Sequence, residues 1–177
     1  MDEDQTEGNH RNEGSMCEEL QRSLRSTGFG IGDFTWEQKL AVHRTLFPFV
    51  SSKAALQDKH FLRGYACSCR IFAMETREEW ELARKYLDAA TEAYQRSYEE
   101  AGTPEAIANL LWAVCLGYTL SADVERMGVE SEEYTRNCYE TAMLLIGILR
   151  EYKAYEALAE YYNTLLHVIG MDGNGRE

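Results

Sequence analysis

A short segment of this chain recurs once, and the recurrence limits the folds that the chain can adopt. The residues Leu62 to Ser68 (LRGYACS) return at Cys115 to Ser121 as CLGYTLS, with the two glycines 53 positions apart. The segment after each copy also recurs, at an offset of 52 that aligns Ala90 with Ala142. Two consecutive helices that recur together predict stacked antiparallel helix hairpins, in which each hairpin buries its apolar face on the next.

The composition favours helices over strands. The chain has 177 residues, of which 45% are hydrophobic and only 2 are proline, and its long windows are dominated by Ala, Leu, Glu, Arg and Tyr. A chain of this length and hydrophobic content can bury one sizeable core. We therefore predict a single all-α domain of stacked hairpins, or a helix bundle, with about seven helices.

Helix-start and helix-stop residues divide the chain into four parts. We predict a disordered acidic tail over 1–15, a short helix and glycine-rich linker over 16–34, a helical-repeat domain over 35–170 and a frayed C-terminus over 171–177. Within the domain, helices are expected over about 35–48, 52–76, 77–100, 104–127, 131–150 and 151–169. Thr76 and Glu79 form a capping box. Gly102, Thr103 and Pro104 are a C-terminal cap, an N-cap and a first helical residue.

The spacing of apolar residues predicts the buried face of each helix. The stripe expected on the helix over 52–76 includes Leu62, Tyr65, Ala66, Cys69, Phe72 and Ala73. The helix over 104–127 is apolar nearly all round, which is typical of a central helix with neighbours on both sides. Its most apolar run, Leu110 to Leu120, is too short to span a bilayer.

The helix after the first Gly-Tyr pair has the spacing Ala83-x3-Leu87-x2-Ala90, which resembles the second-helix signature of tetratricopeptide repeats. The matching positions of the second copy are Thr135, Tyr139 and Ala142. The resemblance spans Phe61 to Ile169, and the repeating unit of this chain, 52 to 53 residues, is longer than that of the family. It implies close packing of helices through small residues and a concave surface that docks peptide segments or partner helices.

The charge of the chain indicates which partners it can have. Its formal net charge is −12, which argues against nucleic acid or an anionic membrane as a direct ligand and favours a protein or peptide, a basic one fitting best. The polar N-terminal residues contain no apolar signal-peptide region, so we expect a cytoplasmic protein. The five cysteines are expected to be reduced and mostly buried: Cys17, Cys67, Cys69, Cys115 and Cys138.

No motif in the sequence points to catalysis, a cofactor or a metal. Cys67 and Cys69 project about 200° apart around a helix, so their thiols cannot share one ion. His43 lies on an apolar stripe, where a neutral, hydrogen-bonded core histidine is expected. The sequence therefore predicts no enzyme, no catalytic residue, no cofactor and no metal site.

Tyrosine is the residue type that best suits a recognition surface. All 11 tyrosines lie between Tyr65 and Tyr162, and we expect most of them to fill the core. The last helix is the exception, because an acidic and aromatic strip there could meet a basic partner segment. The predicted partner-binding residues are Tyr152, Glu156, Glu160 and Tyr161.

The leading hypothesis is a non-catalytic protein–protein interaction module that acts as an adaptor or regulatory binding protein. Two alternatives stay open. The net charge is compatible with an acidic inhibitor or decoy of a nucleic-acid-binding protein, and an interhelical pocket would suit a small-molecule sensor or an enzyme. The last helix ends in LLHVIG, so a homodimer through this helix is a further expectation.

Overall fold

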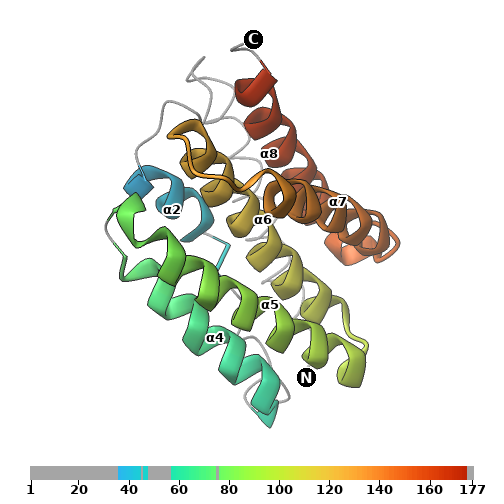
Figure 1. Cartoon of the computed structure of the whole chain (residues 1–177). Helices are drawn as coiled ribbons and strands as arrows, with labels where there is room; N and C mark the ends of the chain where they lie inside the picture. Colours follow the sequence, from blue (N-terminus) through green and yellow to red (C-terminus); the bar gives the residue numbers. More distant parts are fainter. Residues whose placement is uncertain (1–35, 45, 48–56, 75, 175–177) are drawn as a thin grey trace. The chain divides into compact units, whose positions relative to one another are not determined.

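The structure, a computed structural model, describes residues 36–44, 46–47, 57–74 and 76–174. In this part of the chain all regular structure is helical and comprises six α-helices and two 3-10 helices (Figure 1). The predicted all-α class is thus confirmed, while the tail over 1–15 and the segment over 16–34 lie outside the described residues. The described residues fall into two compact units, one within 34–145 and the other within 146–174, and each is described by itself.

Three long helices form the centre of the unit over 34–145. They are α4 (Lys59–Phe72), α5 (Trp80–Ala101) and α6 (Pro104–Arg126), and the 3-10 helix η2 (Arg77–Glu79) precedes α5. α5 packs between α4 and α6 (Figure 1). The small and apolar residues of the repeat-like spacing, Ala83, Leu87 and Ala90, are buried in α5, together with Trp80 and Tyr94.

The turn between α5 and α6 has the predicted caps. Gly102 ends α5 with a left-handed φ of 63°, a conformation that favours glycine. The Thr103 side chain then accepts a hydrogen bond from the backbone N–H of Ala106, and Pro104 is the first residue of α6. These three residues therefore set the direct reversal of the chain from α5 into α6.

α4 starts later than predicted, at Lys59, because Asp58 caps it. The Asp58 carboxylate accepts hydrogen bonds from the backbone N–H groups of His60 and Phe61, at 2.9 and 3.2 Å, and from the Ser97 hydroxyl at 2.6 Å. Burial acts to raise the pKa of Asp58, but these hydrogen bonds outweigh it and lower the pKa below its ordinary value. Asp58 thereby joins the start of α4 to α5.

The predicted buried stripe of α4 is wrong. The buried residues of α4 are Phe61, Gly64, Ser68 and Ile71, whereas Leu62, Ala66, Cys69 and Ala73 are exposed. The reason is close packing on α5, because a Cβ at Gly64 would lie 2.6 Å from a ring carbon of Tyr94. Small residues must face this tyrosine, so a pattern based on large apolar residues selects the wrong side of the helix.

The second copy of the recurrent segment turns its small residues toward the next helix in the same way. A Cβ at Gly117 in α6 would lie 3.0 Å from the hydroxyl oxygen of Tyr134 and 3.3 Å from Sγ of Cys138, both in α7 (Glu132–Leu149). Ser121, four residues later, lies 2.9 Å from the Thr135 hydroxyl. The recurrence of Gly and Ser at this spacing thus marks a contact face in both copies.

The two copies nevertheless pack in different registers. Gly64 contacts Tyr94, which is late in α5, whereas Gly117 contacts Tyr134, which is in the first turn of α7. In the alignment of the two copies Tyr94 corresponds to Ile146, not to Tyr134. The sequence recurrence is therefore a shared small-residue face rather than a repeated set of contacts.

α6 is the buried helix of this unit, as predicted. The run from Leu110 to Leu120 alone is too short to cross a membrane, but the longer segment Pro104–Glu125 is long and apolar enough to do so. In this structure 94% of the most apolar window of that segment is buried in the protein. Burial by neighbouring helices is the ordinary explanation of such a segment in a helical core.

α2 (Trp36–Arg44) packs on α6 and is followed by an aromatic cluster. The Phe47 ring lies 4.8 Å from that of Tyr65, 4.9 Å from that of Phe72 and 5.4 Å from that of Trp112. Aromatic rings at these separations add to the free energy that burial of their area supplies. The cluster joins the end of α2 to both α4 and α6.

The described part of the other unit contains the end of α7, the 3-10 helix η3 (Lys153–Tyr155) and α8 (Glu156–Asn174). The predicted helix over 151–169 is therefore interrupted, because Tyr152 has an extended conformation before η3. At its other end α8 continues to Asn174, past the predicted end at about residue 169. Among the side chains described up to residue 167, the buried residues of η3 and α8 are Tyr155, Leu158, Ala159, Tyr161, Tyr162, Leu165 and Leu166.

Candidate functional site

The predicted partner-binding strip is only partly at the surface. Tyr152, Glu156 and Glu160 are exposed, but Tyr161 is 0% exposed and cannot contribute to a surface contact in this structure. Tyr161 lies three residues after Leu158 and four before Leu165, so it belongs to the buried face of α8. The Glu160 carboxylate accepts a hydrogen bond of 2.6 Å from Nε of Arg150.

A polar layer lies buried between α2 and α6. The Lys39 ammonium is 2.5 Å from the Asp123 carboxylate, and both side chains are 3% exposed. One turn along α2, Nε2 of His43 lies 2.8 Å from the Thr119 hydroxyl. The His43 carbonyl oxygen also accepts a hydrogen bond of 2.8 Å from Trp112 Nε1.

The hydrogen bonds of this layer determine the tautomer of His43. The single hydroxyl hydrogen of Thr119 is donated to the carbonyl oxygen of Cys115 at 2.9 Å, so Thr119 can only accept from His43. Nε2 of His43 therefore carries the hydrogen, and Nδ1 has no hydrogen-bond partner. Burial lowers the pKa of His43 from 6.5 to about 3, which confirms the predicted neutral core histidine.

This layer is suited to positioning helices rather than to catalysis. Lys39, His43 and Asp123 are each at most 3% exposed, so no substrate in solvent reaches them. A buried ion pair with good geometry fixes the register of two helices, because a shifted register would bury each charge without its partner. We therefore assign the layer to the docking of α2 on α6.

The expectation that the cysteines are mostly buried is wrong, because only Cys115 is buried among the four described cysteines. Burial raises the pKa of the Cys115 thiol well above its ordinary value and that of Cys138 to about 12. Such thiols stay protonated at neutral pH and are poor nucleophiles. Cys67 is half-buried and Cys69 is exposed, and none of the four described cysteines forms a disulfide. No group of three or more potential metal ligands occurs among the described residues.

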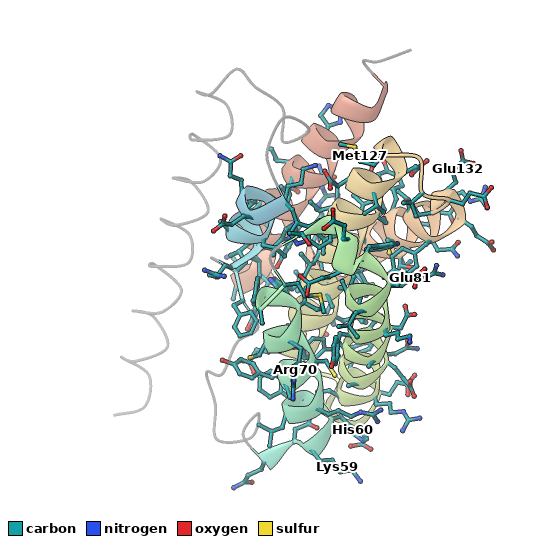
Figure 2. All side chains as sticks on the ribbon, turned by 60° about the vertical axis from the view of Figure 1, so that its left-hand side comes forward. Lys59, His60, Arg70, Glu81, Met127 and Glu132 are labelled. Atoms are coloured by element: carbon teal, nitrogen blue, oxygen red, sulfur yellow. The ribbon has the colours of Figure 1, made fainter. Side chains whose placement is uncertain are left out.

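An open hollow of about 590 Å³ lies at the turn between α6 and α7. The Tyr134 ring forms part of its wall, with the Arg84 guanidinium 4.9 Å from the ring centre and the Trp80 ring 5.8 Å away. The charged residues of its wall are Arg84, Glu125, Glu130, Glu132, Glu133 and Arg136. Four glutamates against two arginines make this hollow acidic. Met127 and Glu132 lie on either side of the same turn (Figure 2).

A second hollow of about 420 Å³ lies at the start of α4, where Lys59 and His60 are found (Figure 2). Its acidic residues, Asp58 and Glu100, contact other residues of the protein. Asp58 accepts the helix-capping hydrogen bonds and Glu100 lies 3.0 Å from Nε2 of His60. This hollow therefore offers few groups to a ligand.

Exposed large apolar side chains concentrate near the α6–α7 turn and on α7. Eight are exposed among the described residues, and five of them fall within residues 127–144. These five are Met127, Val129, Tyr139, Met143 and Leu144, with Met127 60% and Leu144 66% exposed. The five fall into two groups, Met127 and Val129 at the turn and Tyr139, Met143 and Leu144 on α7, and grouped exposed apolar side chains often mark a contact surface.

The sequence prediction missed this surface although a signal was present. The buried residues of α7 include Ala142 and Leu145, which share one side of the helix. Met143 and Leu144 lie outside that stripe, so they are apolar residues without a place in the core. Such residues were predictable candidates for a contact surface.

Comparisons with protein-family models, with curated proteins and with solved structures found no match. The fold and the surface therefore define a class only: an all-α protein with exposed apolar side chains on α7 and an acidic hollow at the α6–α7 turn.

Proposed function

We propose that this chain is a non-catalytic protein-binding module that acts as an adaptor or regulatory protein. Its stacked helix hairpins would resemble those of tetratricopeptide repeats. The observation that carries the proposal is the concentration of exposed apolar side chains over residues 127–144. Water contact with so much apolar area is unfavourable, and burial under a partner would remove that cost.

Two further observations support binding over catalysis. The polar groups that could do chemistry in the described core, His43 and Lys39, are closed to solvent. The thiols of Cys115 and Cys138 stay protonated at neutral pH because burial raises their pKa values. A contact surface, by comparison, needs apolar area rather than activated groups.

Site-specific photo-crosslinking tests the proposal. A photoreactive phenylalanine analogue at Leu144 should capture a discrete protein in cells, whereas the same analogue at Leu62, an exposed leucine of α4, should not. Capture of no protein from either position would contradict the proposal. Stabilisation by a metabolite in a thermal-shift screen would then favour a small-molecule sensor instead.

The acidic decoy is separated from the adaptor by the salt dependence of partner binding. Binding to a decoy of nucleic acid weakens steeply as salt rises and is competed by DNA or RNA. Contact through Met143 and Leu144 depends mainly on apolar area and should be far less sensitive to salt.

A further inference from the structure

The exposed side of α7 has an ordered distribution of acidic and apolar residues. On an α-helix, residues seven and eleven positions after a given residue lie within about 20° of its direction. Glu132, Tyr139 and Met143 therefore form one row, and Glu133, Glu140 and Leu144 form a second row beside it. All six residues are exposed, and we call them the α7 face.

The two rows have the same polarity. Each begins with a glutamate in the first turn; the first row ends in Tyr139 and Met143, and the second in Leu144. Arg136 lies between the rows and reduces the negative charge of the first half of the face. This half still has three glutamates and one arginine, so its net charge is negative. Over about 16 Å the α7 face thus changes from acidic to apolar.

We infer that the α7 face binds an amphipathic helix of a partner protein, whose apolar residues lie on Tyr139, Met143 and Leu144 and whose lysines or arginines lie on the glutamates. This inference rests on the proposed function and specifies its partner. Charge complementarity selects the basic partner, because the acidic hollow at the α6–α7 turn adjoins Glu132 and Glu133 and extends the acidic end of the face. A helical partner matches a single straight helix face by ridges and grooves along its length.

Peptide display tests the inference with the complete chain as bait. A library of random amphipathic helices is selected on the wild-type protein, and one enriched peptide is synthesised with a fluorescent label for anisotropy measurements. The enriched sequences should combine apolar residues at helical spacing with lysine or arginine two to three turns away. Leu144→Glu should raise the Kd of that peptide at least about 10-fold, since burial at a contact centre dominates affinity, while the control Leu62→Glu should leave it unchanged.

The charge arm compares two variants with the same net charge. Glu140→Lys should raise the Kd about 3- to 10-fold, with the difference shrinking at high salt, whereas Glu99→Lys on α5 should not. Unaltered thermal unfolding of each variant shows that folding is retained, as expected for exposed positions.

Several outcomes would overturn the inference. Enriched peptides that tolerate Leu144→Glu would place binding on another face and leave the proposed function standing. A dimer in sedimentation that Leu144→Glu dissociates would make the occupant a second copy of this chain. Absence of enrichment, or enrichment of acidic peptides, would also refute a basic helix, and photo-crosslinking from position 144 would then decide on the proposed function by itself.

Discussion

Acidification should destabilise this protein through His43 in particular. His43 is buried as the neutral form, with a pKa lowered from 6.5 to about 3, so the folded state excludes a proton that the unfolded state binds. The stability from this group is complete above pH 6.5 and is lost progressively as the pH falls from 6.5 toward 3. The full difference corresponds to about 5 kcal/mol, of which about 2 kcal/mol is lost between pH 7 and pH 5.

Urea unfolding at pH 7 and pH 5 measures this effect. His43→Gln removes the titration and keeps an N–H that can donate to Thr119. The wild-type protein should lose about 2 kcal/mol more than this variant between the two pH values, because the other titrating groups contribute equally to both. His167→Gln, at an exposed position, serves as the control and should lose stability as the wild type does. Equal losses for wild type and His43→Gln would refute the assignment of a neutral buried His43.

Three more substitutions follow from the packing. Gly147→Ala should raise the free energy of unfolding by about 0.5 to 1 kcal/mol in thermal melts, because the helix gains propensity without a clash. Gly64→Ala should destabilise by about 1 to 3 kcal/mol and more than Gly117→Ala, since its Cβ would meet a buried ring instead of the ends of side chains; equal costs in urea unfolding would contradict this order. Asp123→Ala should cost about 3 to 5 kcal/mol, and the double variant Lys39→Met with Asp123→Leu should recover most of that loss in the same assay.

The caps and the central helix were predictable because they depend on local chemistry. Gly102, Thr103 and Pro104 specify a turn through their own conformational preferences, whatever packs around them. α6 is apolar on nearly every side from Ala106 to Leu120, so a buried position is expected whichever way the helix is turned. In both cases the sequence itself contains the physical cause.

The buried side of α4 and the placement of Tyr161 were not predictable in the same way. Which side of α4 is buried depends on Tyr94, a large residue of another helix that requires Gly64 opposite it. Tyr161 was expected to adjoin the exposed strip, but the buried face of α8 is wide enough to include it. Tertiary contacts decide both cases, and they override a hydropathy pattern based on a single helix.

The hydroxyl groups in the interhelical contacts also give those contacts a direction. Thr119 and Ser68 each donate their single hydrogen to a carbonyl four residues earlier in their own helix. Each hydroxyl can then only accept across the interface, from His43 in one case and from Tyr94 in the other. His43 or Tyr94 can therefore be replaced by another hydrogen-bond donor without loss of the contact. A residue that can only accept a hydrogen bond would place two acceptors opposite each other at either position. The helices are thus matched by hydrogen-bond polarity as well as by shape.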